Sequence, residues 1–227
     1  MKTLIVWDFD NTLANRKNGK WSKTLSEIAF EKAGEIVDPQ KFSPLLKTGF
    51  FWNNWENPHS HISSEEKWWD EMRPLFEDAF ERLSLPKYLA DFVREYYTDA
   101  SKWELAEGAT DVLSYFEKKG FAQAVLSNHV PELHFLIEAL GIGRFFEKIY
   151  TSAQTGYEKP HQKMFDIVKN DFAGFENIWI VGDSLTADIE GGKKAGFKTC
   201  WVNHEKKEVP DSLQIDCVVS QLEEIIT

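Results

Sequence analysis

Cysteine is scarce in this chain of 227 residues: only Cys200 and Cys217 are present, each inside an apolar stretch. Two cysteines are too few for a disulfide scaffold or for a zinc site with four ligands. We expect both to be reduced, buried thiols on late strands.

Long apolar runs and basic clusters are also missing. No stretch approaches the roughly 18 apolar residues of a transmembrane helix, and the first strand starts without the layout of a signal peptide. The formal charge of −11, with no strong Lys/Arg run, argues against a general surface for nucleic acid or anionic membranes. We expect a soluble cytoplasmic protein, a monomer or a homodimer, whose partner is a small molecule.

Apolar residues make up 42% of the chain, enough for one full core. Strand-like runs alternate mostly with helical segments, which indicates an α/β fold with a mainly parallel sheet. The expected strands are 3–7, 122–126, 148–151, 178–181, 199–202 and 217–219. Helix signals lie between them at 111–119, 131–140 and 160–169, where Pro160 should stand in the first turn.

About ninety residues separate the first strand from the second, far more than a βα connection uses. Residues 15–102 should therefore form an inserted domain, leaving 1–14 and 103–227 as the core. Its signals are helical at 23–33, 65–83 and 87–97, with Ser63 and Glu66 as a capping box for the second segment. Pro74 should kink or split that helix. Six of the nine tryptophans lie between the first strand and the next core element: Trp21, Trp52, Trp55, Trp68, Trp69 and Trp103.

Two carboxylates stand two residues apart where the first strand should end. Asp8 and Asp10, followed by Asn11 and Thr12, come directly after the apolar run 4–7. In a parallel α/β sheet, reactive groups gather outside the carboxyl ends of the strands. On local grounds alone, however, Asp and Asn here would also suit a turn that caps the strand.

Three later segments carry polar groups at the expected ends of strands: Ser127 with Asn128, Lys159 with Pro160, and Asp183 with Asp188. Each has a local explanation as well. The serine and asparagine suit a helix N-cap, and most lysines are solvated on the surface. The two aspartates suit a strand end and a first helical turn.

Together the four motifs resemble those of the haloacid dehalogenase-like hydrolase superfamily, in family order and over the whole chain outside the insert. The resemblance implies a Rossmann-like parallel sheet core, with 15–102 similar to the helical (C1) cap domain of many members. Most members use an aspartate nucleophile and Mg²⁺. The chain should then be an enzyme, a phosphoric monoester phosphatase.

The resemblance also implies a role for each motif residue. Asp8 would attack phosphorus and become an aspartyl-phosphate, with Asp10 as general acid and afterwards as base. Lys159 would offset negative charge, and Asp188 looks like an outer-sphere metal ligand or a partner for this lysine. The implied phosphate site is Thr12, Ser127, Asn128 and Lys159, and the implied Mg²⁺ site is Asp8, Asp10, Asp183 and Asp188.

The sum of the charges in the implied site predicts how readily Asp10 takes up a proton. Four ionised aspartates against Mg²⁺ and one lysine leave the cluster net negative, and a proton on Asp10 would make it neutral. We therefore predict that the proton affinity of Asp10 rises in the complex.

Other functions stay open. A phosphomutase shares the first half of the reaction, and a non-catalytic binding protein would have lost a motif acid. Dehalogenases of the superfamily need no metal and lack the acid at the position of Asp10. The expected substrate is a small phosphorylated metabolite, either a sugar phosphate or a nucleoside monophosphate, since 199–203 is similar to a nucleotidase-like branch. The aromatic stretch 50–55 suits either stacking on a base or packing inside the insert.

Overall fold

The main sheet of the computed structural model has six strands, all parallel, in the order β5-β4-β1-β6-β7-β8. The described residues are 2–17, 19–62, 64–210 and 212–226. The strands are β1 (Thr3–Trp7), β4 (Ala122–Ser127), β5 (Lys148–Thr151), β6 (Asn177–Gly182), β7 (Lys198–Val202) and β8 (Cys217–Val219). The predicted α/β fold is confirmed, and every predicted strand ends within about one residue of its observed bounds.

The strand order sets the place of the site. From β1 the chain reaches β4 and then β5 on one side, and it later crosses to β6, β7 and β8 on the other. The order therefore reverses at β1, which lies between β4 and β6. In open parallel sheets, ligands bind outside the carboxyl ends of the strands at such a reversal.

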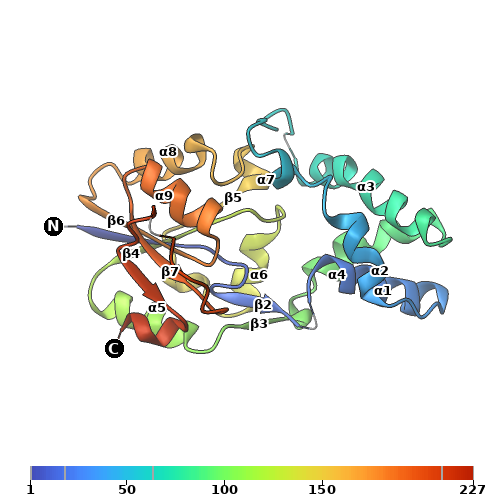
Figure 1. Ribbon diagram of the computed structural model, residues 1–227, viewed down its shortest axis with the longest axis horizontal. Helices are drawn as coiled ribbons and strands as arrows, with labels where there is room; N and C mark the ends of the chain where they lie inside the picture. Colours follow the sequence, from blue (N-terminus) through green and yellow to red (C-terminus); the bar gives the residue numbers. More distant parts are fainter. Residues whose placement is uncertain (1, 18, 63, 211, 227) are drawn as a thin grey trace.

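Helices cover both faces of this sheet: α5 (Ala109–Lys118) lies on one side, and α8 (Gln162–Asp171) and α9 (Gly191–Lys194) lie on the other (Figure 1). Alternate side chains of β1 point to opposite faces. Leu4 and Val6 are buried in a cluster that includes residues of α8, whereas Ile5 and Trp7 belong to a second cluster with residues of α5. Packing on both faces holds β1 rigidly, and with it the residues that follow.

Between β2 (Ala14–Arg16) and β3 (Trp103–Leu105), which pair antiparallel, the chain forms a helical segment. We call residues 19–98 the helical insert. Figure 1 shows it beyond β2 and β3, at the opposite end of the molecule from the N-terminus. Its elements are α1 (Trp21–Ala33), α2 (Pro39–Phe42), η1 (Ser43–Leu46), η2 (Phe51–Asn54), α3 (Glu65–Arg82), η3 (Lys87–Phe92) and α4 (Val93–Thr98). The division of the chain into two domains at 15–102 stays a prediction.

Helix α3 is unbroken, so Pro74 does not split it, while the kink expected as the other outcome stays a prediction. Ser63, the predicted capping residue, lies outside the described residues; the N-cap is Ser64, whose Oγ accepts from the Lys67 N–H at 3.2 Å. Pro74 lies on the exposed side of the helix. There the carbonyl that loses its partner can bind water, while the apolar side holds the helix together. That buried side consists of Trp68, Trp69, Met72, Phe76, Ala79 and Phe80.

Two further expectations need correction. Pro160 precedes α8 instead of standing in its first turn, because His161 is the N-cap and its Nδ1 accepts from the Lys163 N–H at 3.2 Å. Cys200 and Cys217 lie opposite each other on β7 and β8 as free thiols, but only Cys200 is buried. Cys217 is half-buried because β8 is at the edge of the sheet. No helix among the described residues is long and apolar enough to span a membrane.

Candidate active site

The first motif begins on the sheet and continues into a tight turn. Asp8 extends β1 by one residue, and its N–H donates to the Val181 carbonyl of β6 at 2.9 Å. The next residues turn sharply, with Asn11 in the left-handed region at φ 60°, a conformation that Asn tolerates better than most residues. Asp8 is consequently buried and fixed, whereas Asp10 lies in the turn with its side chain partly exposed.

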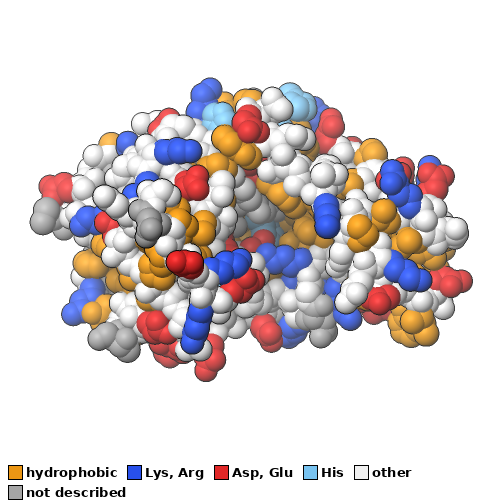
Figure 2. All heavy atoms as spheres, in the orientation of Figure 1, with side chains coloured by type: hydrophobic (Ala, Val, Ile, Leu, Met, Phe, Trp, Pro, Cys, Tyr) orange, Lys and Arg blue, Asp and Glu red, His pale blue; other side chains and the backbone are white. Residues whose placement is uncertain are grey.

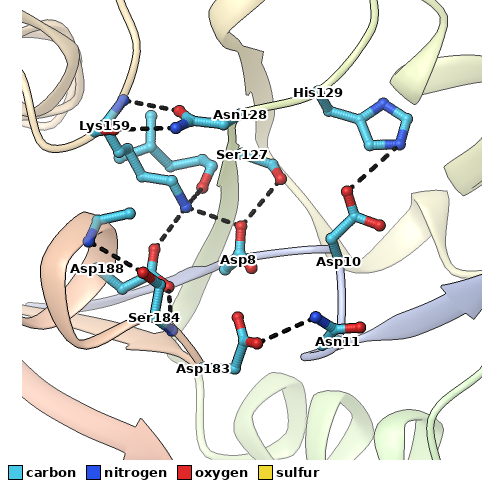
Figure 3. A network of polar contacts seen from close by, with 12 residues as sticks. Asp8, Asp10, Asn11, Ser127, Asn128, His129, Lys159, Asp183, Ser184 and Asp188 are labelled. Atoms are coloured by element: carbon cyan, nitrogen blue, oxygen red, sulfur yellow. Dashed lines mark hydrogen bonds and ion pairs between the residues drawn. The ribbon is translucent and has the colours of Figure 1, made fainter. Parts of the chain in front are cut away.

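Asp8 is bound by groups from two other motifs. Ser127, the last residue of β4, donates its hydroxyl to Asp8 Oδ1 at 2.9 Å, and Lys159 Nζ donates to the same oxygen at 2.7 Å (Figure 3). The lysine also donates to Asp188 Oδ1 at 2.5 Å and to the Leu126 carbonyl at 2.7 Å. All three donor positions of its ammonium are therefore satisfied.

Asn128 holds the backbone of Lys159. Its Nδ2 donates to the Lys159 carbonyl at 2.9 Å, and its Oδ1 accepts from the Lys159 N–H at 2.7 Å. This pair of bonds joins the end of β4 to the loop before α8 and aims the lysine at Asp8. The side chain predicted to bind phosphate is thus engaged in placing the lysine.

Three carboxylates form a group that could hold a metal ion. Asp8, Asp183 and Asp188 each offer an oxygen, and these atoms all lie within 4.8 Å of one another. Asn11 Nδ2 donates to Asp183 Oδ2 at 3.1 Å and orients that side chain. Hard oxygen donors with room for water suit Mg²⁺, so the residues present fit this ion. The Asp10 carboxylate points away from the group, toward His129 (Figure 3).

The charges in this site shift one another's pKa values. Burial alone lowers the pKa of Lys159, but the Asp188 and Asp8 carboxylates outweigh it and the pKa rises, so the lysine is an ammonium ion. Burial, aided by Asp8 and Asp183, raises the pKa of Asp188 to about 7 despite the lysine. Burial and Asp8 also raise the pKa of Asp183. The carboxylates therefore repel one another, and a bound divalent cation would reduce this repulsion.

Sequence reasoning missed two neighbours of Asp10. Lys20 Nζ lies 3.2 Å from Asp10 Oδ1, and His129 Nε2 lies 4.0 Å from Asp10 Oδ2. His129 directly follows the Ser127–Asn128 motif, so its position near the site could have been predicted from the sequence. The position of Lys20 could not, because this residue comes from the insert. Burial lowers the pKa of His129, so this imidazole is neutral near pH 7.

Thr12 is the one predicted site residue that the structure places outside the cavity lining. Its side chain is wholly buried, and it is not among the residues that line the cavity over Asp8. Its role in binding phosphate stays a prediction. The other predicted residues all line that cavity: Asp8, Asp10, Ser127, Asn128, Lys159, Asp183 and Asp188.

The cavity has a volume of about 550 Å³ and lies between the sheet and the helical insert. Figure 2 shows the hollow in the middle of the molecule, with hydrophobic side chains along its wall and charged side chains beside it. The insert supplies most of the apolar lining: Trp21, Leu46, Phe50, Trp52, Trp55 and Tyr97. A cavity of this size and character suits a small organic ligand.

A parallel sheet with this strand order and these four motifs at its carboxyl edge defines a class of hydrolase. The family model of haloacid dehalogenase-like hydrolases matches residues 2–196, and the chain belongs to this family. The predicted family is thereby confirmed.

Known relatives agree with the assignment. The HAD-hydrolase YfnB of Bacillus subtilis is 37% identical over 112 residues, which cover 48% of this chain and 47% of YfnB. The pyrimidine 5'-nucleotidase YjjG of Escherichia coli is 32% identical over 91 residues, which cover 39% of this chain and 40% of YjjG. Each alignment thus spans less than half of the relative. The crystal structure of magnesium-bound YfnB superposes with a TM-score of 0.74 at 22% identity, covering 99% of this chain and 96% of YfnB.

Proposed function

We propose that the protein is a Mg²⁺-dependent phosphatase that hydrolyses a small phosphorylated metabolite through an aspartyl-phosphate. The observation that carries this proposal is the arrangement at Asp8. Among the described residues, the side-chain contacts of its carboxylate with Ser127 and Lys159 both fall on Oδ1. The carboxylate is thereby oriented through Oδ1, and the proposed attack on phosphorus would use Oδ2.

The residues around Asp8 match the needs of phosphoryl transfer. Phosphate esters resist attack because their oxygens are negative and their leaving alkoxide is strongly basic, so positioning and charge stabilisation do most of the work. Lys159 supplies fixed positive charge beside the nucleophile. Asp8 and Asp183, with Asp188 nearby, would hold Mg²⁺, and the family resemblance adds the backbone carbonyl of Asp10. The ion would supply further positive charge to the phosphoryl oxygens.

Asp10 stands where an acid–base group is needed. Its carboxylate lines the same cavity as Asp8 but lies outside the three-carboxylate group. As general acid it would protonate the departing oxygen, and as base it would then take a proton from the water that hydrolyses the aspartyl-phosphate. The family's dehalogenases lack this acid, which favours phosphoryl chemistry here.

The helical insert would act as a cap that selects the substrate. Its aromatic residues form one wall of the cavity. Either a ring or an aliphatic chain of a substrate could pack against such a wall. We propose a sugar phosphate or a nucleoside monophosphate as substrate. The relative YjjG, a pyrimidine 5'-nucleotidase by name, supports the second choice. Movement of the insert would admit the substrate, in keeping with the interdomain movement described for YfnB.

A panel of phosphorylated metabolites tests the proposal, with released phosphate measured in the presence of Mg²⁺ or of EDTA. We expect Mg²⁺-dependent release that is abolished in Asp8→Asn and unchanged in Asp70→Asn, an exposed acid on α3. Phosphate that moves within the substrate without release would indicate a phosphomutase instead.

The covalent intermediate has its own test. Acid quenching during turnover, followed by borohydride reduction, should convert the phosphorylated Asp8 to homoserine in the peptide that contains it. Mass spectrometry of that peptide from the wild type and from Asp8→Asn would show it. Full turnover without modification of Asp8 would overturn the proposed mechanism.

A further inference from the structure

The side chain of Lys20 reaches from the helical insert to the core. It is the residue before α1, and its Nζ lies 3.2 Å from Oδ1 of Asp10, in the turn after β1. The side chain is about one-third exposed (34%) and lines the cavity. Its partner is therefore the acid–base group of the proposed reaction, not a surface carboxylate.

Hydrogen bonds with Arg16 fix the backbone at Gly19, the residue before Lys20. Gly19 has a φ of 99°, which few residues other than glycine adopt. Its N–H donates to the Arg16 carbonyl at 3.1 Å, and Arg16 Nη1 donates to the Gly19 carbonyl at 3.0 Å. The buried guanidinium also reaches the insert, where Nη2 donates to Glu27 Oε2 at 2.9 Å and to the Tyr96 carbonyl at 3.2 Å.

The other side of Asp10 faces a rigid, neutral group. His129 Nε2 lies 4.0 Å from Asp10 Oδ2, and its ring is enclosed by Phe9, Tyr97 and Trp103. Lys159 cannot serve Asp10, since its ammonium is already bound to Asp8 and Asp188. Positive charge at Asp10 therefore comes from Lys20.

Lys20 also changes the charge balance of the site. Burial lowers the pKa of Lys20, but the Asp10, Asp8 and Asp183 carboxylates outweigh burial and raise it, so the side chain is an ammonium ion. Four ionised aspartates, two lysines and one divalent cation are neutral together. The count made from sequence had one lysine and left the site with one net negative charge.

We propose that Lys20 is a positioning residue that fixes the Asp10 carboxylate at the leaving-group side of the cavity when the insert lies against the core. The proposal rests on the phosphatase function proposed above. Because the two residues belong to different parts of the fold, the acid–base group is oriented only while the insert covers the site. Closure of the insert over the substrate and proton transfer by Asp10 are thereby linked through one contact.

The alternative is a peripheral ion pair that contributes little, as exposed pairs commonly do. The dependence of kcat on the leaving group distinguishes a positioning role from a peripheral ion pair. An alkyl phosphate releases a strongly basic alkoxide that needs a proton, whereas p-nitrophenyl phosphate releases a stable phenolate that does not. Loss of orientation at Asp10 should therefore affect the first ester far more than the second.

The test compares kcat and KM of the wild type, Lys20→Met, Lys20→Gln and Lys20→Arg on both esters with Mg²⁺ present. We expect both neutral variants to lower kcat on the alkyl phosphate by roughly 10- to 100-fold and on the aryl phosphate by less than about threefold. Lys20→Arg should recover most of the loss. Lys23→Met, one turn into α1 at a residue outside the cavity lining, should match the wild type on both esters.

Several results would overturn the proposal. Equal losses on both esters would indicate a general role in binding or folding, and unchanged kinetics would indicate a peripheral pair. Circular dichroism and thermal melting check folding for each variant, and if Lys20→Met unfolds, Lys20→Gln and Lys20→Arg give the same comparison. A wild type that releases phosphate from neither ester would overturn the proposed function, and this role with it.

Discussion

His59 Nε2 lies 3.1 Å from Glu158 Oε1, and both side chains are almost wholly buried. His59 belongs to the loop between η2 and α3, whereas Glu158 immediately precedes Lys159 in the core. A second buried carboxylate, Glu132 of the core, accepts from Trp69 Nε1 at 3.0 Å and from Arg94 Nε at 2.6 Å. The insert is thus docked on the core by polar contacts far from the strands that connect the two.

Removal of Glu158 should weaken this docking. Glu158→Leu leaves the buried His59 without its partner, and we expect the free energy of unfolding to fall by about 1–3 kcal/mol. Urea unfolding measures the change, and amide hydrogen exchange should show faster opening of residues 51–62. Glu147→Leu, at an exposed position, is the matched control. A midpoint equal to that of the wild type would show that the contact contributes nothing to docking.

A glycine at the same contact gives a second prediction. Gly156 has a φ of 76°, and a Cβ there would lie 2.5 Å from the Cα of Ser60 in the insert. Gly141 has nearly the same φ, 75°, with no atom within 4 Å of an added Cβ. Both alanine variants carry similar backbone strain, so the extra destabilisation of Gly156→Ala measures the insert–core contact alone.

Thermal melting of the two variants should place Gly156→Ala several degrees below Gly141→Ala, since ~1 kcal/mol moves the midpoint by a few degrees in a chain of this size. Coinciding midpoints would mean that the loop around Ser60 moves away at no cost.

Mg²⁺ affinity should depend on pH. The pKa of Asp188 is raised to about 7, so without metal this carboxyl is protonated below that pH, and the cation must displace the proton. Affinity should therefore weaken as pH falls from 8 to 6, by up to about tenfold per pH unit for each proton released.

Isothermal titration in two buffers of different ionisation enthalpy would count those protons. We expect close to one proton released at pH 6 and few at pH 8, with the release lost in Asp188→Asn. Equal affinities at both pH values would contradict the prediction.

Trp52 should influence which substrate is accepted. It lines the cavity and stacks on Phe50 with ring centroids 4.1 Å apart, so one face is already covered. If the other face receives a base, Trp52→Ala should raise KM for a nucleoside monophosphate roughly tenfold or more while KM for a sugar phosphate changes little. Phe135→Ala, an exposed ring on α6 (Leu133–Ala139), is the control. An equal change in KM for both substrates would show that Trp52 serves only the packing of the insert.

Much of the fold was predictable from the sequence because buried parallel strands are short apolar runs whose polar residues stand at their ends. Asp8, Ser127 and Asp183 each follow such a run, and the sheet brings these ends to one edge. Their convergence on Lys159 therefore follows from local patterns and strand order alone.

The contacts between insert and core could not be predicted in this way. His59 and Glu158 are 99 residues apart, and no periodicity links them. The same holds for Lys20 with Asp10, whose approach depends on how the insert sits over the sheet. Pro74 failed as a helix breaker for a related reason: tertiary packing of one face of α3 outweighs the lost backbone bond.

The ladder of β2 and β3 pairs Asn15 with Glu104 and joins the two chain crossings side by side. The chain therefore enters and leaves everything from α1 to α4 through this one two-stranded ladder, while all six strands of the main sheet lie outside that segment. Recombination at this ladder would replace Lys20 together with the rest of the insert. A new insert would need its own cation beside Asp10, so substrate choice and acid–base catalysis are tied to each other in evolution.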